Sequence, residues 1–275
     1  MYRVGWFSTG RGQGSRALLQ AIHDSITSGE VNASIEFVFC SRDPGEAEPT
    51  DAYLKLARGY GYPVVTFSYQ KYRRARRQRT PPPGEPMPQW RLDYDREVMA
   101  RLARFKPDLC VLAGYMLILG PELCQRYNFI NLHPAAPWGP TGIWQDVIWK
   151  LIETDARASG VMMHLAVPEL DRGPVVTYCT FPIRGPAFDH HWEEVRRRSL
   201  EEVRRTEGAD NALFKAIRQH GAARELPLVV ATVRAFAEGR VRITADKQVV
   251  DASGKITAGQ DLTPEIERRL SRQLP

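Results

Sequence analysis

The 275-residue sequence has no apolar run that approaches the roughly 18 residues of a membrane-spanning helix. Its beginning reads directly as a strand and lacks the apolar segment of a signal peptide. The four cysteines show no Cys-x-x-Cys spacing, so neither a zinc site nor a disulfide framework is predicted. We therefore expect a cytoplasmic protein that contacts no membrane and needs no metal.

Positive charge exceeds negative charge by +6, and two clusters at residues 71–79 and 196–198 carry much of the excess. Neither cluster is interleaved with a platform of aromatic side chains on which bases would stack. Solvated surface is therefore favoured over a nucleic-acid site. Binding of phosphate elsewhere in the chain stays open.

Strand-like and helical patterns alternate through the first 180 residues, which predicts an α/β fold with a doubly wound, mainly parallel sheet. A charged helix over His190–Arg205, a second helix over Leu226–Glu238 and a terminal hairpin predict a helical and hairpin extension. The expected strands are Tyr2–Ser8, Ser34–Cys40, Pro63–Phe67, Asp108–Ala113, Phe129–His133, Gly160–Val167 and Val175–Phe181, and the expected helices between them are Arg16–Ser25, Asp51–Tyr60, Asp95–Phe105 and Ile143–Thr154.

We expect residues 1–275 to form a single domain with a catalytic core, 1–185, and an extension, 186–275. Residues 71–92 interrupt the alternation with a basic run and then a proline-rich run. Prolines at this density continue neither a helix nor a sheet ladder. This segment is predicted to be an exposed insertion.

A glycine-rich turn, Ser8–Arg16, joins the first strand to the first helix. Backbone N–H groups at a helix start attract phosphate, although the turn matches neither the Walker A motif nor the full dinucleotide fingerprint. A plain tight turn is the alternative. Ser15 and Arg16 favour the phosphate cradle, which would consist of Gly12, Gly14, Ser15 and Arg16.

Asn131 and His133 stand two residues apart at the end of an apolar strand, and Pro134 ends that strand. Residues at this spacing point to one face, so both side chains can act on one atom. A structural pair that satisfies neighbouring backbone groups is the alternative. Further along, Asp171 is expected in a turn between two strands, where Asp is commonly a turn former.

These residues belong to an ordered set of motifs that resembles the folate-dependent formyltransferases, and among them the phosphoribosylglycinamide formyltransferases. The set extends over most of the chain. It comprises Asn131-Leu132-His133-Pro134, Gly142, Gly160 four residues before His164, Leu170-Asp171-Arg172-Gly173-Pro174, the glycine-rich turn, Ala113–Leu119, Leu226–Val229 and Gly239–Val241.

The resemblance implies that Asn131, His133 and Asp171 catalyse formyl transfer from 10-formyltetrahydrofolate to a primary amine. Attack by the amine creates an oxyanion, for which Asn131 and protonated His133 can donate hydrogen bonds. Asp171 would favour the imidazolium and relay a proton from the amine to the leaving N10. This chemistry needs neither a metal nor a covalent enzyme intermediate.

The resemblance also assigns the substrate pockets. The acceptor's phosphate would bind at Gly12, Gly14, Ser15 and Arg16, and His164 would support the site. Leu117 and Leu119 fit the apolar core equally well. The folate would contact Met116, Leu117, Ile118, Leu119, Val167 and Glu169.

Several positions depart from the family's pattern. Ala135-Ala136-Pro137-Trp138 replaces Ser-Leu-Leu-Pro, Leu117 stands where an arginine is usual, and Ala222 replaces a ribose-contacting Glu, for which Glu225 is a substitute at a different spacing. The expected partner is a small phosphorylated amine, glycinamide ribonucleotide or a relative, as in purine biosynthesis. A sugar-amine formyltransferase and a folate- or nucleotide-binding paralogue with little catalysis are the alternatives, and a homo-oligomer stays open.

Overall fold

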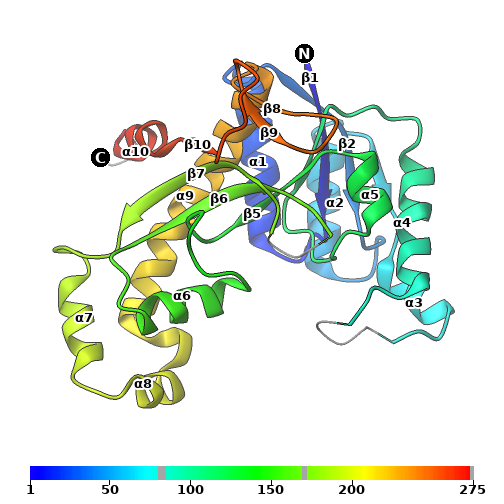
Figure 1. The fold of residues 1–275 in the computed structure, drawn as a ribbon. Helices are drawn as coiled ribbons and strands as arrows, with labels where there is room; N and C mark the ends of the chain where they lie inside the picture. The colour runs from blue at the N-terminus through cyan, green and yellow to red at the C-terminus, as the bar shows by residue number, and fades with distance from the viewer. Residues whose placement is uncertain (80–84, 169–171, 273–275) are drawn as a thin grey trace. The chain divides into compact units, whose positions relative to one another are not determined.

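The computed structural model describes residues 1–79, 85–168 and 172–272, and the chain divides into two compact units (Figure 1). The units are discontinuous in sequence, so they differ from the predicted division at residue 185, which stays a prediction. The first unit contains Met1–Asn131, Leu165–Pro174 and Val233–Ile256, and the second contains Leu132–His164, Val175–Thr232 and Thr257–Pro275.

The first unit is built on parallel strands in the order β5-β4-β1-β2-β3, in which it contains β5 as far as Asn131. In the register of this sheet, Phe7 of β1 lies opposite Phe39 of β2 and Leu112 of β4. The predicted parallel α/β arrangement is confirmed. The bounds are β1 Tyr2–Ser8, α1 Gln13–Thr27, β2 Ala33–Cys40, α2 Glu48–Gly59, β3 Val64–Thr66, α3 Tyr69–Ala75, α4 Gln89–Leu102, β4 Leu109–Leu112, α5 Pro121–Arg126 and β5 Phe129–His133.

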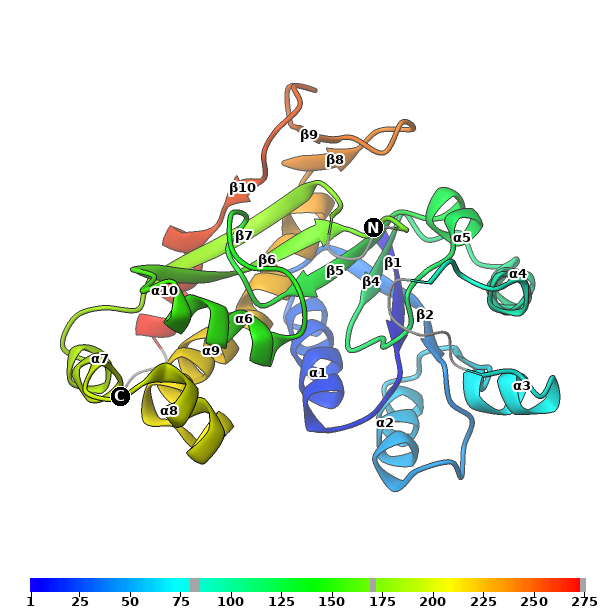
Figure 2. The same cartoon turned by 60° about the horizontal axis from the view of Figure 1, so that its bottom comes forward.

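Helices cover both faces of this sheet because successive strand side chains point to opposite sides. Phe7 enters a buried aromatic cluster that α3, α4 and α5 complete, and its ring lies 4.9 Å from that of Phe129 and 5.8 Å from that of Tyr115. Its neighbour Trp6 is fully buried and points to the other face, where α1 and α2 lie (Figures 1 and 2). The first unit is therefore doubly wound, as predicted.

The predicted exposed insertion, 71–92, is corrected at both of its ends. Helix α3 includes its first residues and α4 begins at Gln89. Tyr72 and Trp90 are buried in the aromatic cluster, so the packing of two aromatic side chains outweighs the charge of the basic residues around Tyr72. The centre of the insertion, residues 80–84, lies outside the described residues.

The predicted terminal hairpin is present as β8 (Val241–Ile243) and β9 (Val249–Asp251), paired antiparallel. Lys247 stands in its turn with a positive φ of 60°. The Lys247 Nζ donates to the Tyr127 carbonyl at 2.9 Å and to Asn128 Oδ1 at 2.8 Å. The hairpin thus anchors the residues that lead into β5.

The second unit contains β6, paired antiparallel with β7, and β10, which pairs parallel with β7. Helices α6, α7, α8 and α9 (Figure 2) contribute to an apolar cluster around Trp149, Trp192 and Phe214. The bounds are α6 Trp144–Glu153, β6 Ala158–Leu165, β7 Val175–Pro182, α7 Asp189–Arg196, α8 Leu200–Thr206, the 3-10 turn η1 Gly208–Asp210, α9 Ala212–Ala237, β10 Gln260–Asp261 and α10 Thr263–Ser271.

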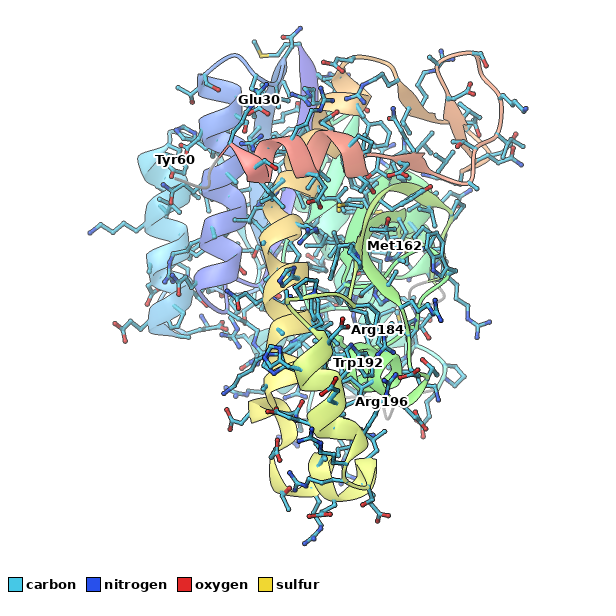
Figure 3. All side chains as sticks on the ribbon, turned by 90° about the vertical axis from the view of Figure 1, so that its left-hand side faces the viewer. Glu30, Tyr60, Met162, Arg184, Trp192 and Arg196 are labelled. Atoms are coloured by element: carbon cyan, nitrogen blue, oxygen red, sulfur yellow. The ribbon has the colours of Figure 1, made fainter. Side chains whose placement is uncertain are left out.

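A cation–π contact attaches α7 to the residues that follow β7. The Arg184 guanidinium lies 3.6 Å from the centroid of the Trp192 ring, and that of Arg196, on α7 itself, lies 5.9 Å from it (Figure 3). Asp155 accepts from both arginines, at 2.8 and 2.9 Å. The indole N–H of Trp192 donates to the Ile183 carbonyl at 2.6 Å. A buried ring that is satisfied in this way fixes the helix against the end of β7.

Two helix predictions for the extension are corrected. The expected helix His190–Arg205 is two helices, because Ser199 begins α8 by accepting from the Glu202 N–H. The expected helix Leu226–Glu238 begins well before Leu226, at Ala212, and runs through Pro227. Among the described residues, no helix is both long and apolar enough to span a membrane.

Candidate active site

Strand β5 presents Asn131 and His133 at its carboxyl end. Phe129 and Ile130 are fully buried and fix the strand in the sheet through pairing with β4. Asn131 is half-buried, whereas His133 is only 2% exposed. Because the two residues are separated by one position on a strand, both side chains leave the backbone on the same side.

The imidazole of His133 is held by the loop that follows it. Its Nε2–H donates to the Pro140 carbonyl at 3.1 Å, and a carbonyl can only accept. Nε2 is therefore the nitrogen that carries the hydrogen in the neutral ring. The ring of His164 lies edge-to-face with that of His133, at 6.1 Å between centroids.

Ala135 and Ala136, two of the loop residues that differ from the pattern of the resemblance, are buried rather than exposed. Gly160 lies beneath it, and a Cβ on Gly160 would stand 3.1 Å from the Ala136 Cα and 2.7 Å from the Cys179 carbonyl oxygen. The close approach explains the small residues at these positions. Trp138 instead is 70% exposed, so the loop presents an aromatic ring at its tip.

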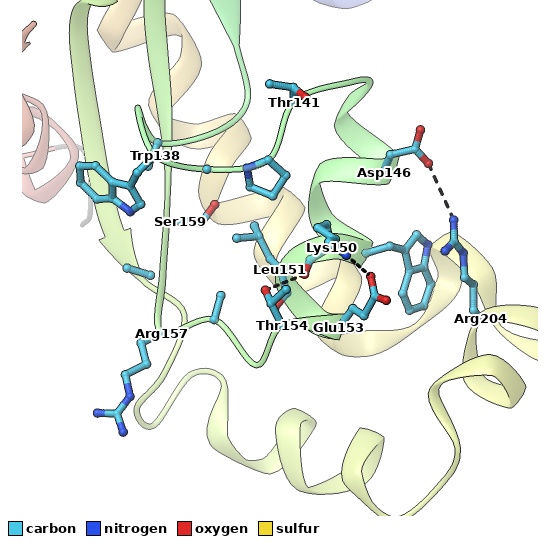
Figure 4. Close-up of a pocket in the computed structure, with 16 residues that line it drawn as sticks. Trp138, Thr141, Asp146, Lys150, Leu151, Glu153, Thr154, Arg157, Ser159 and Arg204 are labelled. Carbon is cyan, nitrogen blue, oxygen red and sulfur yellow. Dashed lines mark hydrogen bonds and ion pairs between the residues drawn. The ribbon is translucent and has the colours of Figure 1, made fainter. Parts of the chain in front are cut away.

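The same loop lines a cavity of about 960 Å³ in the second unit (Figure 4). Trp138 and Thr141 come from the loop, and the opposite wall is α6 with the beginning of β6. Charged groups around the cavity pair with one another: Lys150 with Glu153 at 2.9 Å, and Arg204 with Asp146 at 3.8 Å. The cavity is large enough for a small molecule, and its charges are largely compensated.

In the first unit, the glycine-rich turn leads into α1 without a side-chain cap. Gly12 is the N-cap residue, and the first turn of α1 contains no acidic residue. A Cβ on Gly12 or Gly14 would meet no protein atom within 4 Å, so protein packing does not require glycine at these positions. The helix start therefore offers N–H groups that no side chain caps, and groups of this kind bind phosphate.

The turn also contacts the segment that follows β4, to which the sequence assigns folate binding. Thr9 N–H donates to the Gly114 carbonyl, and the Met116 N–H donates to Thr9 Oγ1, both at 3.0 Å. Gly114 has a positive φ of 71°, and a Cβ there would lie 2.7 Å from Ser15 Oγ. The structure thus brings the predicted phosphate and folate segments together.

Exposure divides the four predicted folate-binding residues after β4. Met116 is 59% exposed and Ile118 is 48% exposed, whereas Leu119 is buried in the aromatic cluster and Leu117 packs against it. Leu119 is therefore a core residue. The backbone and the outward side chains of this segment are what a ligand in the first unit can reach.

Two residues that the sequence reasoning did not single out hold this segment. Arg91 and Asp95, on α4, form a buried ion pair. Arg91 Nη2 donates to the Ile118 carbonyl at 2.5 Å, and the Gly120 N–H donates to Asp95 Oδ2 at 2.7 Å. The signal available in the sequence was an Arg and an Asp four residues apart beside Trp90 and Tyr94, on the apolar side of a helix.

The second predicted folate segment starts beside β5. The Ala166 N–H donates to the Phe129 carbonyl, and the Leu165 N–H donates to the Pro174 carbonyl, both at 2.8 Å. A Cβ on Gly173 would stand 1.6 Å from the Leu165 carbonyl oxygen, so only glycine fits there. Val167 is half-buried. The predicted residues Glu169 and Asp171 lie outside the described residues.

Within residues 1–79, 85–168 and 172–272, no three His, Cys, Asp or Glu side chains are grouped so that they could hold a metal ion. All four cysteines are buried, and none of them forms a disulfide. Burial raises the pKa of the Cys40 and Cys179 thiols to about 11.

Comparison with known proteins agrees with the motifs. The formyl transferase family model matches residues 11–202. Phosphoribosylglycinamide formyltransferase of Escherichia coli is 27% identical over 173 residues, 62% of this chain and 70% of its own length. That of Haemophilus influenzae is 26% identical over 251 residues, 90% and 94% of the two chains. The solved structure of the Coxiella burnetii phosphoribosylglycinamide formyltransferase is similar in fold, with a TM-score of 0.64, 21% identity and coverage of 94% and 98%. The match to the family model extends over well more than half of the sequence, and the chain belongs to the formyl transferase family.

Proposed function

We propose that this protein transfers the formyl group of 10-formyltetrahydrofolate to the primary amine of a small phosphorylated acceptor, glycinamide ribonucleotide or a close relative. The observation that carries the proposal is the end of β5, where Asn131 and a tautomer-fixed His133 leave one strand on the same side. Membership of the formyl transferase family supports it, as do the names of the relatives.

In the proposed reaction, the amine nitrogen attacks the formyl carbon and the bond from that carbon to N10 breaks. The formyl oxygen carries negative charge in between, and the Asn131 amide N–H stabilises it. Protonated His133 is the second donor, through Nδ1, because Nε2–H is already committed to the Pro140 carbonyl. The proton lost by the amine reaches N10, with Asp171 as the proposed relay. Atoms and charge balance without any further reactant.

The start of α1 supports a phosphorylated acceptor. Gly12, Gly14 and Ser15 provide the uncapped N–H groups there, and Arg16 follows in the first turn. Contacts through Thr9 join this turn to the Met116–Leu119 segment, where the folate is proposed to bind. We propose that Val167 and Glu169 complete the folate site. The cytoplasmic location and the oligomeric state stay predictions from the sequence.

The test is a continuous absorbance assay of tetrahydrofolate release from 10-formyltetrahydrofolate, with glycinamide ribonucleotide as the first amine. His133→Ala and Asn131→Ala should each lower kcat by about 10² to 10⁴, the range measured when an oxyanion donor or acid–base group is removed. His190→Ala, at an exposed imidazole on α7, is the matched control and should retain full activity.

Three results would contradict the proposal. Activity close to wild type in His133→Ala would exclude the assigned role of that ring. Release that is equally fast without an amine would mean that water is the acceptor. Folate binding without release, over a panel of amines that includes amino sugars, would favour a binding protein with little catalysis.

A further inference from the structure

Thr9, which follows β1, holds two backbone groups of the segment after β4. Its N–H donates to the Gly114 carbonyl, and its hydroxyl oxygen accepts from the Met116 N–H, both at 3.0 Å. The left-handed conformation of Gly114, with a φ of 71°, turns the chain so that both groups face Thr9. A single residue thus fixes the backbone to which folate binding is assigned.

The hydroxyl of Thr9 is itself held in place. Thr9 is only 6% exposed, and its Oγ1 lies 3.0 Å from the Ser41 Oγ. A hydroxyl has one hydrogen and two lone pairs, so Thr9 Oγ1 can accept from Met116 and share a second hydrogen bond with Ser41. Rotation of this side chain would leave both partners unpaired, which costs free energy in a buried place. Thr9 is therefore a rigid point of attachment.

The residues after Thr9 lead to the helix start that is proposed to bind the acceptor's phosphate. Gly10 is held from two sides, because its N–H donates to Ser8 Oγ at 3.1 Å and its carbonyl accepts from Thr50 Oγ1 at 3.2 Å. One residue separates Gly10 from the N-cap of α1. Hydrogen-bond networks and rigid elements of this kind carry coupling between sites. A ligand that restrains the start of α1 would therefore act on the segment after β4 through Thr9.

We propose that Thr9 is a positioning residue that couples the binding of the two substrates, an inference that rests on the proposed function. A phosphate at the start of α1 strengthens the binding of folate at Met116–Leu119, and folate strengthens the binding of phosphate by the same factor, because coupling between two sites is reciprocal. One hydrogen bond can carry a coupling of about fivefold, the lower end of the usual range. Ser15 provides a second contact between the same parts, since a Cβ on Gly114 would lie 2.7 Å from its Oγ. Replacement of Thr9 leaves that contact unchanged.

Calorimetry on the full chain measures the coupling without turnover. Tetrahydrofolate is titrated into the protein in saturating inorganic phosphate and, as the reference, in chloride at the same ionic strength. Phosphate should lower the Kd of tetrahydrofolate about fivefold in the wild type and less than about twofold in Thr9→Val, which keeps the branched shape but has no hydroxyl. Thr9→Ser, which keeps the hydroxyl, should retain the coupling.

The matched control is Ser41→Ala. This change removes the other partner of the Thr9 hydroxyl and leaves the bond to the Met116 N–H intact. It should lower the Tm, as Thr9→Val does, but it should keep the effect of phosphate. A purely structural role of Thr9 would change stability and the affinity for tetrahydrofolate, and would leave the ratio of the two Kd values as it is in the wild type.

A coupling of about fivefold that persists in Thr9→Val would overturn the inference and would assign the connection to the packing of Ser15 on Gly114. Loss of the coupling in Ser41→Ala as well as in Thr9→Val would equally overturn it. So would a wild-type protein that binds tetrahydrofolate with the same or a higher Kd in phosphate. A wild-type protein that binds no tetrahydrofolate would instead contradict the proposed function. The two failures are therefore distinguishable.

Discussion

Replacement of Arg91 by Met tests how α4 positions the segment after β4. Methionine fills much of the same volume but leaves Asp95 buried without its cationic partner. Removal of one member of a buried ion pair costs about 3 to 5 kcal/mol in the free energy of unfolding. The Gly120 N–H still donates to Asp95, so we expect the lower end of that range, about 3 kcal/mol.

The loss of unfolding free energy in Arg91→Met should depend on pH. Burial raises the pKa of Asp95, and the charge of Arg91 and the Gly120 N–H oppose the rise. A carboxyl with a higher pKa in the folded protein binds its proton more tightly when folded. The free energy of unfolding therefore falls as pH rises from the carboxyl's pKa in the unfolded chain, near about 4, through its pKa in the folded protein. Without the charge of Arg91 the pKa of Asp95 in the folded protein is higher still, so the fall continues to higher pH. The difference between variant and wild type should therefore increase from about pH 4 to about pH 7.

Urea unfolding at several pH values measures this difference. Arg91→Met/Asp95→Asn should regain stability at neutral pH, because no charge is then left buried and the introduced amide oxygen can still accept from the Gly120 N–H. Arg96→Met is the control, since Arg96 pairs with Glu122 at the exposed surface and its loss should barely move the urea midpoint. A loss below about 1 kcal/mol in Arg91→Met, or one that does not change with pH, would refute the reasoning.

Three further outcomes are expected. Gly173→Ala should lower kcat/KM, because the added Cβ would shift the turn at Leu165. Alanine at Gly29, which has open space but a positive φ, should affect stability alone. Unchanged kinetics in Gly173→Ala would argue against a role of that turn in the site. Thr232→Val should cost about 1 to 3 kcal/mol in thermal unfolding, because it leaves the Thr177 hydroxyl, 2.6 Å away and buried, without its partner; an unchanged Tm would contradict this. The thiols, including Cys40 with its raised pKa, should react with Ellman's reagent only at the rate of unfolding, and fast labelling of native protein would show that they are accessible.

The regular part of this fold was predictable because the signals there are local. Strands β1 and β5 have the predicted bounds, since apolar runs with a fixed end define them. The end of β5 was readable because Pro134 cannot donate to the ladder. The family match confirms the resemblance that the motifs around this strand indicated.

Other parts depend on packing that a sequence does not display. The sequence predicted a helix that begins at Leu226, because proline is favoured near the start of a helix. Helix α9 instead runs through Pro227, since Leu228, Val229 and Val230 all pack in the interior. The boundary between α7 and α8 was predictable from the sequence, because Ser199 and Glu202 have the spacing of a capping box.

In the candidate site, too, packing decides what the sequence alone leaves open. The pattern of residues 116–119 is apolar throughout, so the sequence left core and ligand contact equally open for Leu117 and Leu119. The structure assigns Leu119 to the core and exposes Met116. The buried pair on α4 was missed because charged residues four apart on a helix are usually at the surface.

The most direct test of the proposed chemistry follows the formyl group itself. Wild-type protein is incubated with 10-formyltetrahydrofolate carrying a labelled formyl carbon and with glycinamide ribonucleotide, and the products are identified by mass spectrometry. The proposal predicts one labelled formyl on the acceptor nitrogen for each tetrahydrofolate released, and formation of that product at least about a hundredfold slower with His133→Ala. Label that appears only as formate, or an acceptor that stays unlabelled, would contradict the account.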